Sequence, residues 1–196
     1  DKLKILALFN QSRGDHSTGI CVDDVVLKDV IPAKEFIIKH TEAFKYQQYD
    51  MSHNTILGHC RQATWAFDKG RASYAHPHET TLNGTDFLRL VHNGSLSNYK
   101  DLAAKYNVKD TDKSDSMIIA EIITNTWPDK SNTVKGNHVL QEYEGSATVI
   151  FYPITMKNTL YVHRDMLREL YFWKPDKDQM YISSMNESLY AIGADV

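Results

Sequence analysis

The sequence predicts an α+β protein in which antiparallel strands and a few helices form one domain. The 196-residue chain is 42% hydrophobic and 24% charged, which is typical of a globular protein that can build a sizeable core. A strongly apolar helix is predicted after Asp115, and the last third of the chain has the alternation of two β-hairpins. Because no repeat or linker interrupts these signals, we expect a single domain over residues 1–196.

The first third of the chain alternates helical and strand patterns. Apolar residues from Leu3 to Phe9 predict a short, mostly buried helix, which Gly14 would end in the left-handed conformation. The segment TGICVDDVVL predicts a strand or a hairpin. Pro32 then suits the first turn of a helix over PAKEFIIKHTEAF, and TILGHCRQAT returns to strand character.

The rest of the chain is predicted as a loop, a strand, one long helix and two hairpins. RASYAHPHETTLNGTD contains two turn signals and predicts a loop, and FLRLVHNGSL predicts a strand that runs into a turn. The segment from Asp115 to Trp127 is apolar on nearly every side, so it predicts a buried helix capped by Ser114 or Asp115. The pairs SATVIFYPI with NTLYVHR and ELYFWK with QMYISS predict antiparallel hairpins.

Charge and composition argue against several classes of protein. A net charge of -3 with no long run of Lys and Arg argues against a nucleic-acid partner. No apolar stretch approaches the ~20 residues that span a bilayer, and DKLKILALFN lacks the features of a signal peptide, so no membrane association is expected. Two cysteines, Cys21 and Cys60, are too few for a secreted disulfide framework. We therefore expect reduced thiols and a cytoplasmic location.

The string His92-Asn93-Gly94 follows the predicted strand and has two interpretations. Asn-Gly pairs favour positive φ and are typical of hairpin turns, which is the simpler interpretation. The same pair can form an oxyanion hole, because an Asn side-chain amide and a following Gly backbone N–H can point at one spot. Glycine also lets a substrate come close to the backbone. These residues alone leave both interpretations open.

The segment GHCRQAT carries a candidate binding residue in Arg61. Alternate side chains share a face of a strand, so His59 and Arg61 would face one way and Cys60 the other. An Arg near the hydroxyl of Thr64 suits a carboxylate clamp, since guanidinium binds carboxylate with two hydrogen bonds, but it can also be a surface cation. The alternation separates Cys60 from His59, so Cys60 is predicted to be a small core residue rather than a nucleophile.

Asp115 and the segment AHPHE complete the candidates. Asp115 at the head of the apolar helix is most simply an N-cap, and its alternative role is to bind a substrate ammonium. His76, His78 and Glu79 are potential metal ligands. Two histidines in a Pro-containing loop rarely form a metal site by themselves, so we prefer a structural turn and expect no metal and no cofactor.

The order of these segments resembles the glutaminase domain of class II glutamine amidotransferases, which belong to the N-terminal nucleophile (Ntn) hydrolases. The strings that carry the resemblance are SRGDHSTGI, GHCRQAT, YAHPHE, VHNGSLSNYKDL, KSDSMII and EGSATVIF. They are similar to the family strings R-G-x-D-S-x-G-I, G-H-T-R-W-A-T, N-A-H-P, H-N-G-x-x-x-N-Y-x-x-L and S-D-[ST]. TLYVHRD and YISSMNESL also look like the family's later Arg-Asp hairpin and Ser-rich strand. The resemblance covers nearly the whole chain.

The resemblance implies an αββα sandwich of two antiparallel sheets between helices, with a site for free glutamine. Arg61, helped by Thr64, would bind the α-carboxylate of the substrate. Asp115 would bind its α-ammonium. Loss of either clamp would leave a substrate charge buried and unpaired.

The resemblance also implies how the amide would be attacked. Asn93 and Gly94 would form the oxyanion hole, and Arg13 and His92 would support the site. In the family, a Cys at residue one of the mature chain is the nucleophile, and its free α-amine, with a pKa of ~7.7–8.0, is the base. The family's first strand, which carries this Cys, does not match the residues after Asp1, so we expect a strand of ~5–6 residues upstream of Asp1.

An ammonia acceptor is a further implication. Amidotransferases pass ammonia to an acceptor site, and the glutaminase-like part occupies the 196 residues, so a separate synthase subunit or acceptor domain is expected. The alternative is a non-catalytic glutamine-binding or assembly module on the same fold.

Three residues depart from the family strings. Gln62 and Trp65 differ from the family in the segment that follows Arg61, and His16 stands where the family often has an acid.

Overall fold

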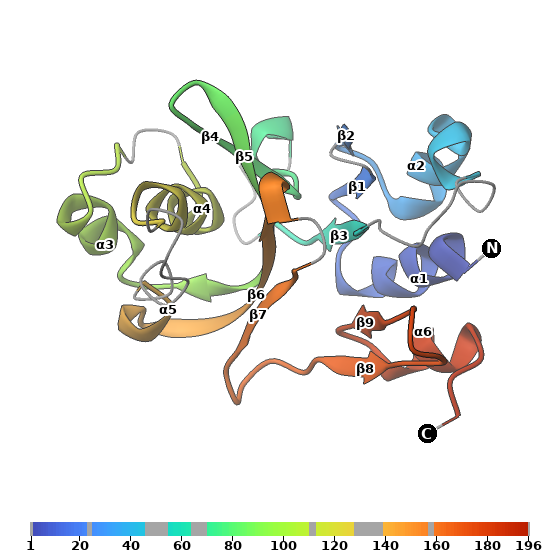
Figure 1. Ribbon diagram of the computed structural model, residues 1–196. Coiled ribbons are helices and arrows are strands. Elements are labelled where there is room, and N and C mark those ends of the chain that lie inside the picture. Colours follow the sequence, from blue (N-terminus) through green and yellow to red (C-terminus); the bar gives the residue numbers. More distant parts are fainter. Residues whose placement is uncertain are drawn as a thin grey trace. The chain divides into compact units, whose positions relative to one another are not determined.

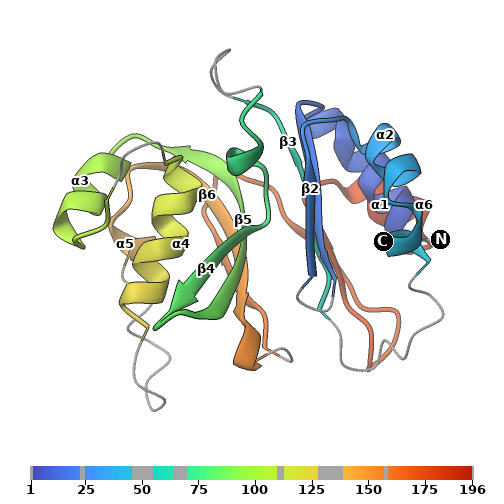
Figure 2. The ribbon, with the colours of Figure 1, turned by 90° about the horizontal axis from the view of Figure 1, so that it is seen from above.

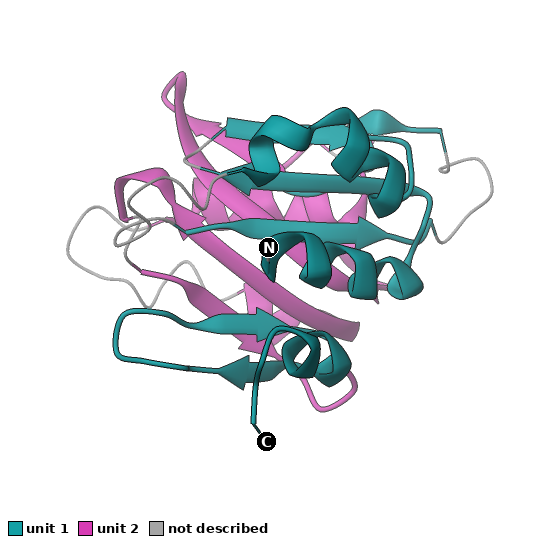
Figure 3. Ribbon diagram, turned by 90° about the vertical axis from the view of Figure 1, so that its right-hand side faces the viewer, with its two compact units in different colours: residues 1–77, 169–196 teal, residues 78–168 magenta. Residues whose placement is uncertain are grey.

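The structure is a computed structural model that divides into two compact units (Figure 1). Unit 1 comprises Asp1–Pro77 and Glu169–Val196, and unit 2 comprises His78–Arg168; Figure 3 colours them separately. The described residues are 2–22, 25–45, 55–63, 70–109, 113–127, 139–156 and 159–195. Thr64 and Trp65 lie outside them.

Unit 1 contains a three-stranded antiparallel sheet in the order β2-β1-β3 and a separate β8–β9 hairpin. Its strands are β1 (Ser17–Val22), β2 (Val25–Asp29), β3 (Leu57–Arg61), β8 (Tyr171–Trp173) and β9 (Tyr181–Ser183). Its helices are α1 (Lys2–Asn10), α2 (Ala33–Lys39) and α6 (Asn186–Ala191), with 3₁₀ turns at Gln11–Arg13, Thr41–Phe44 and Ala72–Tyr74. Ile20 of β1, Phe36 of α2 and Phe44 pack together in a small core.

Unit 2 contains a four-stranded antiparallel sheet in the order β4-β5-β6-β7. Its strands are β4 (His78–Leu82), β5 (Thr85–Leu96), β6 (Gly145–Pro153) and β7 (Tyr161–Arg164). Its helices are α3 (Tyr99–Lys105), α4 (Asp115–Asn125) and α5 (Val139–Glu142), with a 3₁₀ turn at Ile154–Met156. Figure 2 shows α3 and α4 on one face of this sheet, where α4 packs against β4 and β5. Throughout the described ranges, no helix is long and apolar enough to cross a membrane.

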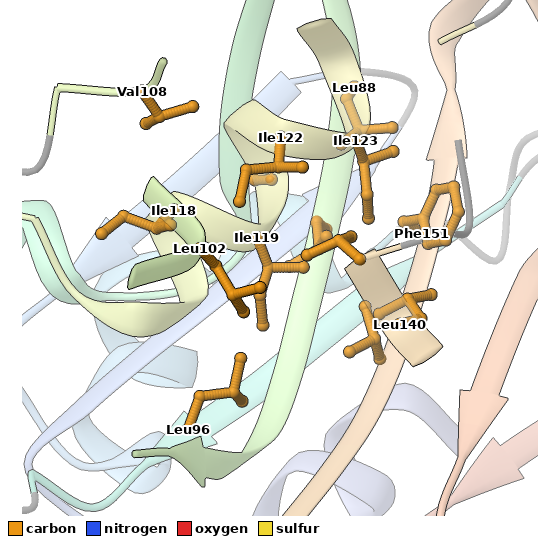
Figure 4. Close-up of a cluster of buried hydrophobic side chains, with 14 of the residues drawn as sticks. Leu88, Leu96, Leu102, Val108, Ile118, Ile119, Ile122, Ile123, Leu140 and Phe151 are labelled. Carbon is orange, nitrogen blue, oxygen red and sulfur yellow. The ribbon is translucent and has the colours of Figure 1, made fainter. Parts of the chain in front are cut away.

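The core of unit 2 lies between α4 and the sheet (Figure 4). Ile119 and Ile122 of α4 are fully buried, as are Leu88 and Leu90 of β5. The helix is apolar on nearly every side because it also packs against α3 and α5. This packing sets the position of the first turn of α4, where Asp115 lies.

Several predicted elements are confirmed. β1 and β2 form an antiparallel pair, the hairpin alternative of the two that the sequence left open. Pro32 directly precedes α2, and the C-terminal third forms the predicted antiparallel pairs β6–β7 and β8–β9. The predicted apolar helix is α4. Its N-cap is Ser114 rather than Asp115, because the Ser114 hydroxyl accepts a hydrogen bond from the Met117 backbone N–H at 3.3 Å.

The first helix differs from its prediction in its burial and in the way it ends. No residue of α1 is fully buried, and Leu8 and Phe9 are 45% and 40% exposed. Gly14 has a φ of 176°, which is extended backbone, so the predicted left-handed cap is wrong. A Cβ on Gly14 would lie 2.2 Å from the backbone nitrogen of Gln62. Glycine is needed there because two backbone segments meet.

The predicted loop over RASYAHPHETTLNGTD contains a strand, so that prediction is wrong in part. Residues 78–82 form β4, which pairs antiparallel with β5. Asn83 and Gly84 join the two strands with φ values of 53° and 78°, the positive values that two-residue hairpin turns use. The strand was missed because its buried positions hold His78 and Thr80 rather than apolar residues.

Truncation of Ile119 tests the packing of α4. Ile119→Ala should lower the free energy of unfolding by about 2–5 kcal/mol, because the buried side chain leaves a cavity. Ile38→Ala is the control, because Ile38 on α2 is 69% exposed and its loss should change stability by less than about 0.5 kcal/mol. Urea denaturation measures both, and equal effects would contradict the packing described.

Candidate active site

The predicted turn at Asn93 and Gly94 lies inside strand β5, so the turn prediction is wrong. Asn93 pairs with Thr148 and Gly94 with Ala147 of β6. The strands approach closely here, since a Cβ on Gly94 would lie 2.0 Å from the carbonyl oxygen of Ser146. Glycine is therefore required by strand pairing.

The side chain of Asn93 is available to a ligand. It is half-buried, and it makes no hydrogen bond to any residue that the structure describes. A carboxamide NH₂ group donates two hydrogen bonds, and such donors stabilise oxyanions in hydrolases. The backbone of Asn93 is thus fixed in a paired strand while its amide can still donate.

Asp115 is the first residue of α4, and its carboxylate binds the end of β5. Oδ2 accepts a hydrogen bond from the Leu96 backbone N–H at 3.0 Å, and Oδ1 accepts one from the Ser116 backbone N–H at 2.8 Å. A carboxylate has about four lone-pair sites, so it can accept further hydrogen bonds. A negative charge is also favourable at a helix N-terminus. The arrangement suits a fixed anion that binds a cation.

A buried contact joins β5 to Asp115. His92 is 3% exposed, its Nδ1 lies 2.9 Å from Ser116 Oγ, and that oxygen lies 3.3 Å from Asp115 Oδ1. Burial lowers the pKa of His92, and the nearby Asp115 carboxylate opposes this shift without overcoming it. A neutral His92 therefore bridges β5 and the first turn of α4.

The part of β6 that faces β5 here is held from its other side. Asp165, just after β7, accepts hydrogen bonds from the Ala147 backbone N–H and from the Tyr143 hydroxyl. Arg168 Nε donates to Ser146 Oγ at 3.0 Å. Burial alone would raise the pKa of Asp165, but its hydrogen bonds, that of Ala147 first, hold the pKa below its usual value. An ionised Asp165 thus fixes β6 beside the site.

Arg61 ends strand β3 in unit 1. Its guanidinium carbon lies 5.6 Å from the centroid of the Tyr74 ring, which is a cation–π contact. The His16 backbone N–H donates to the Arg61 carbonyl at 3.1 Å, and the Ala63 backbone N–H donates to His16 Nδ1 at 2.9 Å. His16 therefore supports the chain from the Arg61 carbonyl to Ala63. Arg13 is exposed in the preceding 3₁₀ turn, and its supporting role stays a prediction.

The predicted site residues belong to different units. Asn93, Gly94 and Asp115 lie in unit 2, which brings them together through the contacts above, and Arg61 lies in unit 1. The joint substrate pocket that includes Arg61 stays a prediction. Thr64 lies outside the described residues.

Neither cysteine has the properties of a nucleophile. Cys21 on β1 and Cys60 on β3 are both buried. Burial raises the pKa of Cys60 to about 12, although a hydrogen bond with Thr18 acts in the opposite direction. Since the thiolate is the attacking species, Cys60 is a small core residue.

The potential metal ligands of the AHPHE segment have other contacts. The His76 ring contacts the His59 ring at a tilt of 34°, with ring centroids 4.1 Å apart. The Glu79 carboxylate on β4 lies 3.9 Å from the Arg89 guanidinium on the paired strand β5. Within the described part of the chain, no three His, Cys, Asp or Glu residues are grouped so that they could hold a metal ion.

Two residues of the unit 2 site were not singled out from the sequence. Ser116 directly follows Asp115 in the S-D-[ST] string, and Asp165 closes the Arg-Asp string after β7. Both lay within recognised strings. Their contacts with His92 and Ala147 join residues 24 and 18 positions apart, which no local pattern indicates.

The chain belongs to the glutamine amidotransferase domain family. The family model matches residues 75–191, which is more than half of the chain. The match includes Asn93, Gly94 and Asp115 together with the side chains that hold them. No curated protein matches the chain in sequence.

Solved structures resemble the chain in fold. One is the glutamine phosphoribosylpyrophosphate (PRPP) amidotransferase from B. subtilis, in complex with ADP and GMP. It is 20% identical in sequence with a TM-score of 0.66, and the match covers 98% of this chain and 41% of that protein. Another, described as the allosteric regulatory enzyme of purine biosynthesis, is 21% identical in sequence with a TM-score of 0.66. That match covers 98% of this chain and 40% of the other protein. The chain thus spans about two fifths of the length of these proteins. These likenesses confirm the predicted α+β, Ntn-hydrolase-type fold.

The buried His92 predicts that stability depends on pH. Its folded-state pKa lies below the ordinary value of 6.5, so below that pH the unfolded state binds more protons and stability falls. His92→Asn keeps a polar atom near the position of Nδ1 but removes the titration. The variant should therefore lose less stability than the natural protein between pH 6.5 and about pH 5. Urea denaturation at several pH values measures the slopes, and equal slopes would contradict a buried, neutral His92.

Proposed function

We propose that the protein hydrolyses free glutamine to glutamate and ammonia through a thioester on an N-terminal Cys that precedes Asp1. The α-amine of that Cys takes the thiol proton, and the thiolate bonds to the side-chain amide carbon. Asn93 and Gly94 stabilise the oxyanion that forms as the carbonyl electrons move to oxygen. The intermediate then expels ammonia, which receives the proton, and water hydrolyses the thioester.

The substrate is held at its two charged groups in this proposal. Arg61, with Thr64, binds the α-carboxylate through the guanidinium fork. Asp115 binds the α-ammonium with the acceptor capacity that its backbone contacts leave unused. The two charges select a free amino acid over a side chain within a peptide.

The observation that carries the proposal is the path of contacts from Gly94 to Asp115. His92 lies beside Gly94 in β5 and contacts Ser116, and Asp115 accepts from the backbone of Leu96 at the end of the same strand. This path supports a fixed spacing between the carbonyl-binding strand and the ammonium-binding carboxylate. A fixed spacing favours glutamine over asparagine, whose side chain is one methylene shorter.

We further propose that both units form one glutaminase domain, and that a separate synthase subunit or acceptor domain receives the ammonia. The solved structures of similar fold are more than twice as long as this chain, which supports an acceptor site outside these residues. The low cysteine content of the chain, two buried residues, supports a cytoplasmic location.

Charge removal at Asp115 tests the substrate clamp. Asp115→Asn keeps one of the two oxygens that accept from the backbone and loses the ionic contact, so kcat/KM for glutamine should fall roughly 10- to 100-fold. Activity on 4-carbamoylbutanoate, which lacks the ammonium group, should not fall with it. Asp101→Asn is the matched control, because Asp101 is an exposed acid in the first turn of α3. Equal effects of the two variants would exclude the clamp.

Mass analysis of the natural protein tests the nucleophile. It should show a mature N-terminal Cys, and a glutamine analogue with a thiol-alkylating group should label that Cys and stop glutamate release. Cys21 and Cys60 should stay unlabelled until the protein unfolds, because both are buried.

A natural chain that begins at Asp1 and shows no turnover would remove the enzymatic proposal. The alternative is then a non-catalytic glutamine-binding or assembly module. Calorimetry distinguishes these two, because glutamine binding that Arg61→Ala abolishes would support a binding module, and no binding would support assembly alone.

A further inference from the structure

One buried hydroxyl in unit 2 lacks a hydrogen-bond partner. Thr148 on β6 is 4% exposed, and its Oγ1 makes no hydrogen bond to the residues that the structure describes. A buried polar group without a partner opposes folding. A hydroxyl kept in this state calls for a partner beyond the residues that the structure describes.

Thr148 points to the same face of the sheet as Asn93. The two residues are directly opposite in the register of β5 and β6, and opposite residues in an antiparallel pair have Cβ atoms about 4.5–5.5 Å apart. His92, the neighbour of Asn93, points to the other face, where it contacts Ser116 of α4. Asn93 and Thr148 therefore share the face away from α4, and neither side chain has a partner in the described ranges.

The Ser17 hydroxyl is likewise buried without a hydrogen-bond partner among the described residues. The Thr124 hydroxyl, by contrast, shows that the fold can supply hydrogen bonds to a buried hydroxyl. In unit 1, Ser17 is 2% exposed, its Oγ has no partner among the described residues, and it pairs with Arg61. In unit 2, the equally buried Thr124 has its Oγ1 2.5 Å from Thr80 Oγ1 and 2.9 Å from the Ala120 carbonyl. The partnerless hydroxyls thus stand opposite proposed substrate-binding residues.

We propose that the Thr148 hydroxyl contacts the substrate, as an acceptor for the carboxamide N–H of glutamine bound at Asn93. This inference rests on the proposed function. Asn93 donates to the carboxamide oxygen, and Thr148 accepts from the nitrogen. The pair therefore orients the amide, with its leaving nitrogen held at Thr148, and distinguishes an amide from an ester.

Three variants test the contact in the protein with its mature N-terminal Cys. Thr148→Val, which is nearly isosteric, should lower kcat/KM for glutamine about tenfold, equivalent to about 1.4 kcal/mol, the size of one neutral hydrogen bond. It should leave hydrolysis of glutamate γ-methyl ester unchanged, because the ester has no N–H. Thr148→Ser should keep the activity on glutamine. Thr124→Val is the matched control and should leave the kinetics unchanged.

Thermal melting gives a readout that does not depend on activity. Thr148→Val should raise the melting temperature by a few degrees, because it removes an unpaired hydroxyl. Thr124→Val should lower it, because it breaks hydrogen bonds that exist. Lower melting of Thr148→Val would show a partner within the protein and overturn the inference.

The kinetic outcomes separate this inference from the proposed function. Unchanged glutamine turnover in Thr148→Val, or equal losses on the amide and the ester, would overturn the inference and leave the proposed function intact. A protein with its mature Cys that neither binds nor hydrolyses glutamine would overturn both.

Discussion

The close pairing of β5 with β6 at Gly94 is the constraint on which the unit 2 site depends. No side chain fits there, since a Cβ would lie 2.0 Å from the Ser146 carbonyl oxygen and 2.7 Å from His92 Nε2. This approach places Asn93 opposite Thr148 on one face of the sheet, while His92 packs on the other face against α4. A larger residue would separate the strands and disturb both faces together.

The helix that builds the core of unit 2 also holds the carboxylate of the site. α4 is positioned by hydrophobic burial on nearly all sides, so Asp115 at its first residue is placed by the core rather than by a loop. A partly buried charge is unfavourable without partners. Asp115 has them in the backbone N–H groups of Leu96 and Ser116. A bound ammonium would therefore add to a stable arrangement, not replace one of its contacts.

The sequence predicted features with local signals and missed those that depend on a distant strand. Apolar periodicity and turn residues are local, so α4 and the C-terminal hairpins were predicted. The order of short strings predicts a site role for Asp115, but it gives no sign of the contact of Ser116 with His92, 24 positions away. The sequence predicts that Gly14 caps a helix and that Gly94 forms a turn. Both are instead glycines because another backbone segment touches them, and local conformational preference does not distinguish these two uses of glycine.

The chemistry of a thiol nucleophile favours a chain terminus over the interior of these strands. Burial raises the pKa of Cys60 to about 12, so the thiol stays protonated at neutral pH, and the protonated form is not the nucleophile. Strand alternation also places His59 on the opposite face, where it does not serve as a base for Cys60. A terminal Cys has its own α-amine, with a pKa of ~7.7–8.0, as base. Paired strands then need to supply only oxyanion and substrate contacts, which are the roles proposed for Asn93 and Gly94 of β5 and for Asp115 of α4.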